Sequence, residues 1–189
     1  VLEPGSSENC QTLNGKMEDF YQSTYGKDSI WTMRKNSGRP LNTDCNEGAA
    51  NISPDGRYLF FAATTQINIH EGSMDIYYSE KIGTQWSTPQ PLPNNVNSGS
   101  FDSQPTFSSD GKTLYFIRAS HPENYHDPEE HFGPNDSQDV WYSELQADET
   151  WNTAKRMPQQ INSTIYNAVL SISDDGKTLF INGEFDKKN

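Results

Sequence analysis

The hydrophobic and polar positions along this chain repeat as short alternating runs, each broken by an Asp-Gly pair. Alternation with a period of two is typical of a half-buried strand. Gly accepts the positive φ that a two-residue hairpin turn requires, and Asp can hydrogen-bond to the local backbone. Three β-hairpins with structural turns at Asp55-Gly56, Asp110-Gly111 and Asp175-Gly176 are therefore predicted in NISPDGRYLFFAA from Asn51, TFSSDGKTLYFIR from Thr106 and SISDDGKTLFING from Ser171.

A further strand is predicted beside each of these hairpins. The segments are MDIYYSEK from Met74, QDVWYSEL from Gln138 and a weaker copy, DSIWTMRK, from Asp28. This alignment makes Trp31, Tyr77 and Trp141 equivalent, as core or inter-blade residues. Trp86 and Trp151 then lead into PQPLPNNVNS and AKRMPQQINS, which fit an outer fourth strand and its exit loop.

The repeating unit is thus a four-stranded antiparallel sheet. Such a sheet cannot bury both faces alone, so the units stack radially as the blades of a β-propeller, which typically has about 4 to 8 blades. We predict an all-β fold with about three blades' worth of chain. The predicted organisation is an N-terminal segment at 1–27 and a partial propeller at 28–189, comprising a part-blade at 28–47, blades at 48–98 and 99–163, and the first hairpin of another blade at 164–189. The missing blades come from chain beyond Asn189, which we favour, or from self-association.

The repeated motifs resemble a known family. SPDGRYLFF, SSDGKTLYF and SDDGKTLFI, with DIYYSE and DVWYSE and then W-S-T-P and W-N-T-A, are similar to the WD-like propeller repeat of Tol-system translocation proteins. They resemble still more the propellers of OmpA-family envelope proteins of Bacteroidetes-type bacteria. The resemblance covers roughly Ser29 to Phe185, and the first copy departs from it, with Ser29 where the others have Asp75 and Asp139.

The resemblance implies a non-catalytic binding or scaffold module. Its expected setting is the periplasm, outer membrane or exterior of a Gram-negative bacterium, and its expected partner is a protein or glycan on one propeller face. Two alternatives stay open. One is the accessory propeller of a prolyl-oligopeptidase-like hydrolase. The other is a propeller glycosidase, which would need carboxylates about 5 to 9.5 Å apart at the central channel.

Charge and cysteine content narrow the partners. The net charge of -12, from 26 acidic and 14 basic residues, argues against binding nucleic acid or an anionic membrane by bulk electrostatics. No apolar run of about 18 residues is present, so the segment shown is not expected to span a membrane. Cys10 and Cys45 could form a disulfide in an oxidising compartment or remain free thiols.

The most unusual stretch is SHPENYHDPEEHFGPNDSQD, from Ser120 to Asp139, which we interpret as a loop insertion within a blade. Long loops on a rigid scaffold often carry binding function. Its imidazoles and carboxylates could hold zinc or calcium, but the spacing matches no ligand motif, and no cofactor is expected. A smaller insertion, QINIHEGS, would project from the same face. The predicted binding residues are His70, Glu71, His121, His126, Asp127, Glu129, Glu130 and His131.

No catalytic residue is predicted. Carboxylates recur at Asp55, Asp110 and Asp175, and again at Asp75 and Asp139. A catalytic group is needed once, whereas a turn or strand-end hydrogen bond is needed in every blade. We therefore assign the repeated aspartates structural roles.

Overall fold

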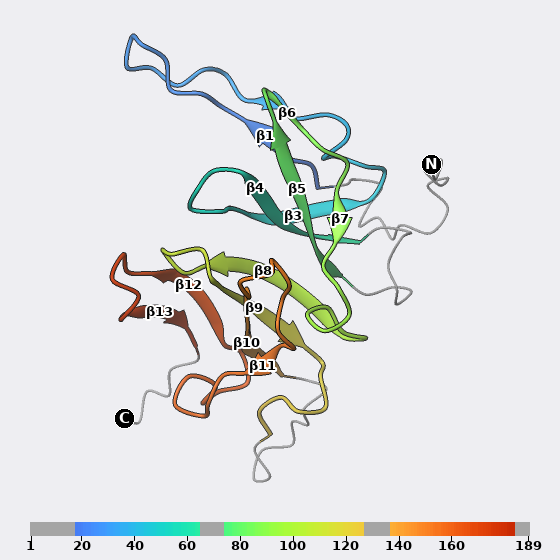
Figure 1. Ribbon diagram of the computed structural model, residues 1–189, viewed down its shortest axis with the longest axis vertical. Coiled ribbons are helices and arrows are strands. Elements are labelled where there is room, and N and C mark those ends of the chain that lie inside the picture. Colours follow the sequence, from blue (N-terminus) through green and yellow to red (C-terminus); the bar gives the residue numbers. More distant parts are fainter. Residues whose placement is uncertain (1–17, 65–73, 127–136, 184–189) are drawn as a thin grey trace.

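The computed structural model describes residues 18–64, 74–126 and 137–183. Within these ranges it contains thirteen strands and no helix, and every pair of named strands is antiparallel. No helix in the described part of the chain is long and apolar enough to cross a membrane. Figure 1 shows the sheets following one another as a row of separate blades.

Two blades are nearly whole. The first has the order β3-β4-β5, and two short segments, β6 and β7, pair with the outer edge of β5. The second has the order β8-β9-β10-β11. Their strands are β3 (Asn46–Ile52), β4 (Tyr58–Thr64), β5 (Asp75–Ile82), β6 (Gln85–Trp86), β7 (Gln90–Pro91), β8 (Phe101–Phe107), β9 (Thr113–Ala119), β10 (Gln138–Glu144) and β11 (Lys155–Arg156).

A strand pair lies at each end of the row. The pair β1-β2 precedes the first blade, and β12-β13 follows the second. Their bounds are β1 (Tyr21–Gln22), β2 (Lys35–Asn36), β12 (Ala168–Ile172) and β13 (Leu179–Asn182). The described chain therefore holds two blades and two half-blades, and the predicted class of an all-β propeller with four-stranded antiparallel blades is confirmed.

Both faces of the first blade are buried, which explains why β4 reads as a nearly continuous apolar run. Phe60 and Ile76 face the second blade and pack with Leu114 and Phe116. On the other face of β4, Phe61 packs against the preceding unit. Successive side chains of a strand point to opposite faces, so one strand contributes to two inter-blade cores.

The expected core positions hold for two of the three aligned aromatic residues. Tyr77 and Trp141 are buried in the two inter-blade clusters. Trp31, in contrast, is largely exposed. It forms a bridge with Tyr25, as Trp151 does with Leu145.

The equivalence of Trp31 with Tyr77 and Trp141 is therefore wrong. Trp31 corresponds to Trp86 and Trp151, and all three tryptophans precede the aspartate of the next Asp-Gly turn by 24 residues. A repeated hydrogen bond fixes the register, because a serine of the third strand donates to the carbonyl of the residue after each tryptophan at 2.6 Å: Ser23 to Thr32, Ser79 to Ser87 and Ser143 to Asn152.

The first unit's third strand consequently starts before residue 28. Asp19, rather than Ser29, occupies the position of Asp75 and Asp139. The pair β1-β2 is a third and fourth strand, with Tyr21 opposite Asn36 as Trp141 is opposite Arg156.

The Asp-Gly turns share one geometry at the end of the blades where β3 leads into β4. The hairpin loop has four residues rather than two, since Ser53 and Tyr58 pair across it. Ser53 Oγ donates to Asp55 Oδ1 at 2.6 Å, and that oxygen also accepts the backbone N–H of Arg57 at 3.0 Å. These hydrogen bonds hold the pKa of Asp55 below its usual range. Gly56 has φ 72°, which explains the requirement for glycine.

The other two hairpins repeat these contacts. Asp110 accepts from Ser108 and Lys112, and Asp175 accepts from Ser173 and Lys177. Each turn thus satisfies its own carboxylate locally.

Candidate binding face

The opposite end of the blades brings together the exit loops and the residues that flank the insertions. Ala119, at the end of β9, is paired both with Phe101 at the start of β8 and with Gln138 at the start of β10. Gln138 also donates its backbone N–H to the carbonyl of Ile165, in the exit loop, at 2.7 Å. We call this end of the molecule the loop face.

A buried asparagine fixes each exit loop to the third strand. Asn97 Oδ1 accepts the N–H of Ile76 at 2.9 Å, and Asn97 Nδ2 donates to the carbonyls of Ile76 and Leu92, both at 3.0 Å. Asn162 makes the same three contacts in the second blade, and Asn42 makes two of them with Phe20. We call Asn42, Asn97 and Asn162 the asparagine brackets.

A second buried polar residue follows each bracket after five positions. The three residues are Glu47, Asp102 and Asn167, all at most 5% exposed. Asp102 Oδ2 accepts both the N–H and the hydroxyl of Ser98 at 2.7 Å. Glu47 Oε1 accepts the same two groups from Thr43. The hydrogen bonds between Thr43 and Glu47, and between Ser98 and Asp102, thus close a tight loop at the start of β3 and of β8.

Arg118 neutralises Asp102 within the second blade. Its Nε lies 2.7 Å from Asp102 Oδ1, and its Nη2 donates to the carbonyl of Val96. The guanidinium carbon lies 4.4 Å from the ring centroid of Trp141, in cation–π contact. Burial raises the pKa of Asp102, and the Arg118 charge and hydrogen bond oppose that rise. The pair holds β8, β9 and β10 together beneath the loop face.

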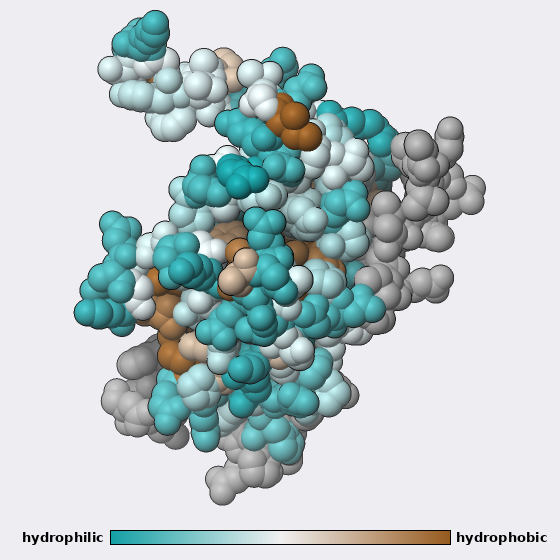
Figure 2. Space-filling view, in the orientation of Figure 1, coloured by the Kyte–Doolittle hydropathy of each residue, from teal (hydrophilic) through white to brown (hydrophobic). Residues whose placement is uncertain are grey.

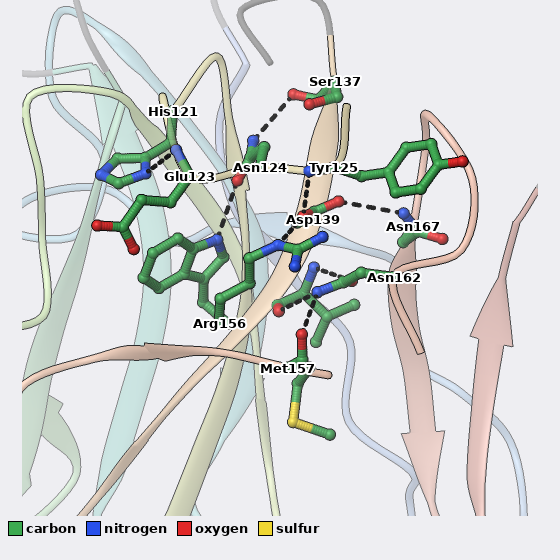
Figure 3. A network of polar contacts seen from close by, with 12 residues as sticks. His121, Glu123, Asn124, Tyr125, Ser137, Asp139, Arg156, Met157, Asn162 and Asn167 are labelled. Atoms are coloured by element: carbon green, nitrogen blue, oxygen red, sulfur yellow. Dashed lines mark hydrogen bonds and ion pairs between the residues drawn. The ribbon is translucent and has the colours of Figure 1, made fainter. Parts of the chain in front are cut away.

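A second ion pair lies under the insertion. Arg156 Nε donates to Asp139 Oδ2, and the same oxygen accepts the backbone N–H of Tyr125 at 2.7 Å. Asn167 donates to the other carboxylate oxygen at 3.3 Å. Figure 3 shows Asp139 at the centre of these contacts, reached from several strands and loops. Burial raises the pKa of Asp139, whereas Arg156 and the hydrogen bonds lower it.

Asn124 anchors the start of the insertion to its end. Its Nδ2 donates to the carbonyls of Arg118 at 2.8 Å and Ser137 at 3.1 Å, and its Oδ1 accepts the indole N–H of Trp141 at 3.1 Å. All the hydrogen-bonding groups of this buried amide except one lone pair are therefore used, which rigidifies the segment. The described root of the insertion is part of the blade's polar core (Figure 3).

His121 packs against the core rather than standing free in solvent. Its ring lies edge-on to Trp141, with centroids 4.8 Å apart, and its Nδ1 accepts the backbone N–H of Glu123 at 3.2 Å. Burial, followed by the nearby charge of Arg118, lowers the pKa of His121. In this contact the Nδ1 atom acts as a hydrogen-bond acceptor.

Only some of the predicted binding residues fall within the described chain. His121 is half-buried and His126 is exposed, and both lie at the loop face. In the described ranges, no group of three or more His, Cys, Asp or Glu side chains is placed to hold a metal ion. The other predicted binding residues lie outside the described residues: His70, Glu71, Asp127, Glu129, Glu130 and His131. Cys10 lies outside them as well.

Sequence reasoning did not find the brackets or the ion pairs. The signal for the brackets is a fixed spacing, because each asparagine stands 11 residues after a repeat tryptophan. The ion pairs carry no such signal. Arg118 aligns with Ala63, and Arg156 aligns with Pro91, so these cations occur in one blade alone.

Cys45 is disulfide-bonded and buried next to this network. It lies two residues before Glu47, in the loop that the Asn42 bracket holds. The disulfide therefore adds a covalent restraint at the loop face of the first unit.

The comparisons with known proteins are sparse. No protein-family model matches the chain, and no curated protein matches it. Solved structures similar to it include the tricorn protease, at 15% identity and a TM-score of 0.41, over 69% of this chain and 12% of that one. A putative TolB from Agrobacterium tumefaciens has 16% identity and a TM-score of 0.40, over 74% of this chain and 44% of that one. The chain thus spans less than half the length of either protein, and its assignment as part of a β-propeller rests on the strand topology above.

Proposed function

We propose that this chain is a non-catalytic binding or scaffold module of a bacterial cell envelope, and that its loop face engages a protein or glycan. The observation that carries the proposal is the anchored root of the insertion. Asn124 and Asp139 fix residues 120–125 to the blade through buried hydrogen bonds. A rigid scaffold that presents an irregular loop is a common arrangement for recognition.

The chemistry of the face supports recognition more than catalysis. The carboxylates of Asp102 and Asp139 each meet a guanidinium and further hydrogen-bond donors from the same chain. A general acid or base must instead reach a reacting group of a substrate. Exposed side chains around this network, such as Glu123 and Tyr166, are available for contact with a partner.

The envelope setting draws support from the disulfide and the charge. Disulfides persist in oxidising compartments such as the bacterial periplasm and are rare in the cytosol, and Cys45 is disulfide-bonded. A net charge of -12 also disfavours binding to nucleic acid. The resemblance of the repeats to those of envelope propellers is consistent with the same setting.

Co-sedimentation tests this proposal. The probes are peptidoglycan sacculi and outer-membrane vesicles from a Gram-negative bacterium, each titrated with the purified chain. The variant Glu123→Ala/Tyr166→Ala removes two exposed groups of the loop face. We expect it to weaken binding at least about tenfold, the loss of one good contact or more.

The matched control is Ile82→Ala/Glu144→Ala, which removes an apolar and an acidic exposed side chain at the turn end. This control is expected to bind as the unmodified chain does. Equal losses in both variants, or no binding to either probe, would overturn the proposal.

A further inference from the structure

In the second blade, a cation stands between two buried acids at the loop face. Asp102 on β8 lies opposite Arg118 on β9, and Arg118 lies opposite Asp139 on β10. Both acids are fully buried, and Arg118 Nε lies 2.7 Å from Asp102 Oδ1. An opposite charge at this distance favours the ionised form of an acid.

The same row of residues in the first blade has no cation at its centre. Glu47 on β3 lies opposite Ala63 on β4, and Ala63 lies opposite Asp75 on β5. Glu47 is 2% exposed, and its Oε2 has no hydrogen-bond partner among the residues that the structure describes. A carboxylate at this position would be neither solvated nor paired with a counter-charge, which favours the neutral acid.

The charged groups on the described segments around Glu47 act in the same direction. Glu18 and Asp19 precede β1, and the carbonyl of Glu18 accepts the N–H of Glu47 at 3.0 Å. Asp44 lies in the same loop as Glu47, and Arg39 pairs with Asp44 at 3.0 Å in an exposed ion pair. The charges of Asp19 and Asp44 add to the effect of burial, since both disfavour a negative charge on Glu47.

The carboxyl of Glu47 closes the loop of residues 42–47, which we call the Glu47 loop. Glu47 Oε1 accepts the N–H of Thr43 at 3.1 Å and also its hydroxyl. Thr43 Oγ1 in turn accepts the N–H of Cys45 at 3.0 Å. The closed form of this loop therefore depends on a carboxyl group whose other oxygen is kept from water.

The loop of residues 97–102, which we call the Asp102 loop, makes the same contacts one blade later. Asp102 Oδ2 accepts the N–H and the hydroxyl of Ser98, and Ser98 Oγ accepts the N–H of Ser100 at 3.1 Å. The acid of this loop has Arg118 beside it. The two loops thus have the same hydrogen-bonding pattern and differ in whether a cation faces the acid.

We propose that the Glu47 loop is a pH-sensitive switch, which is closed when the Glu47 carboxyl is protonated and opens locally when it ionises, while the Asp102 loop stays closed. Opening lets water reach Oε2 and solvate the charge. The two blades are held together by apolar contacts, which Figure 2 shows between them and which do not depend on the charge of Glu47. The switch does not depend on what the loop face binds.

The direction of the response follows from the two states of Glu47. Burial raises its pKa to about 7 in the closed loop, from 4.5, and opening restores its contact with water. The preference for the closed loop is therefore fully present below pH 4.5 and is lost as the pH rises through about 7.

Amide hydrogen exchange measured by NMR between pH 6 and 8 tests the proposal. Each rate is divided by that of an unstructured peptide, which removes the intrinsic pH dependence of exchange. Protection of the Thr43 and Cys45 N–H groups should fall by about tenfold over this range, because local opening exposes them. The Ser98 and Ser100 N–H groups are the control within the same molecule, and their protection should change by less than about twofold.

Three variants assign the response to Glu47. Glu47→Gln keeps the side chain neutral and should abolish the fall in protection. Asp19→Asn changes no residue of the Glu47 loop and removes a charge that raises the pKa of Glu47, so the fall should be smaller than in the unmodified chain. Glu144→Gln removes an exposed carboxylate at the turn end and should leave the fall unchanged.

Three results would overturn the proposal. Equal falls in the Glu47 and Asp102 loops would show that pH changes the stability of the whole fold. Constant protection of both loops would show that Glu47 keeps one protonation state across this range. A fall that persists unchanged in both Glu47→Gln and Asp19→Asn would assign the response to another titrating group.

Discussion

Glu47 and Asp102 occupy the same position in successive units but have different electrostatic surroundings. Both are buried, and both accept the N–H and hydroxyl of the residue that follows an asparagine bracket. Asp102 additionally pairs with Arg118. At the position of Arg118, the first blade has Ala63, and Glu47 Oε2 has no hydrogen-bond partner among the residues that the structure describes.

The difference shows two ways to bury a carboxyl group. A buried charge needs a partner or shifts its pKa until it is neutral. Asp102 has the partner. Burial raises the pKa of Glu47 to about 7, the hydrogen bonds from Thr43 oppose the rise, and the charges of Asp19 and Asp44 add to it. Glu47, in the first unit, is therefore expected to change its protonation state near neutral pH.

The largest effect is expected from removing the cation at Asp102. Arg118→Met should destabilise the protein by about 3 to 5 kcal/mol, because it leaves an uncompensated charge in a buried site. Urea denaturation followed by circular dichroism measures this loss. The double variant Asp102→Asn/Arg118→Met removes both charges and should recover about half of the stability or more. No recovery in the double variant would mean that packing on Trp141, rather than charge, is the main contribution of Arg118.

Removal of an asparagine bracket is expected to lower the free energy of unfolding by a smaller amount. This loss of stability should differ between the same two units. Asn97→Ala removes the partners of the Ile76 N–H and the Leu92 carbonyl in a fully buried site, whereas the Ile76 carbonyl keeps the N–H of Leu92, at a cost of about 2 to 3 kcal/mol. Asn42 contacts Phe20 in a partly exposed unit, so Asn42→Ala should cost about half as much. Urea denaturation of both variants checks the order. Equal costs would show that burial of the third strand does not set the contribution of the bracket.

The repeat made the fold predictable, but it did not predict which cations pair with the buried carboxylates. The Asp-Gly turns and the alternation around Phe60 follow from backbone and packing requirements that every blade shares. The placement of Trp31 failed because DSIWTMRK resembles a third strand locally, whereas the constant spacing of 24 residues to the next Asp-Gly turn places this tryptophan with Trp86 and Trp151. Arg118 was not foreseen because one cation serves one carboxylate, and no periodicity marks a residue that occurs once.

Glu47→Gln tests the other side of the comparison. Glutamine resembles the protonated acid, so the variant should match the unmodified chain at pH 4, where Glu47 is protonated in both the folded and the unfolded state. The pKa of Glu47 is about 7 in the folded state and 4.5 in the unfolded state. The favourable contribution of the protonated side chain to the free energy of unfolding is therefore fully present below pH 4.5 and is lost as pH rises through about 7. At pH 8 the variant should therefore be more stable than the unmodified chain by roughly 1 to 2 kcal/mol.

Urea denaturation of both proteins between pH 4 and 8 gives the difference in the free energy of unfolding as a function of pH. Subtraction removes the contribution of His121, whose lowered pKa acts in the opposite direction. A flat difference would indicate that Glu47 is ionised and paired when folded. The matched variant Asp102→Asn should show no gain at pH 8, since it removes the partner of Arg118.

The smallest effect concerns the hydroxyl groups that both carboxyls share. Ser98→Ala removes one of several donors to Asp102, which retains Arg118 and the Ser98 N–H, and should cost about 1 kcal/mol. Thr43→Val removes a hydrogen bond that lowers the pKa of Glu47, so that pKa should rise further above its usual range. A carboxyl-selective NMR titration of both variants separates these responses. A clear shift of Glu47 with little change at Asp102 is expected, because hydrogen bonds determine the proton affinity of an acid that lacks a cation and matter less where a guanidinium is already in contact.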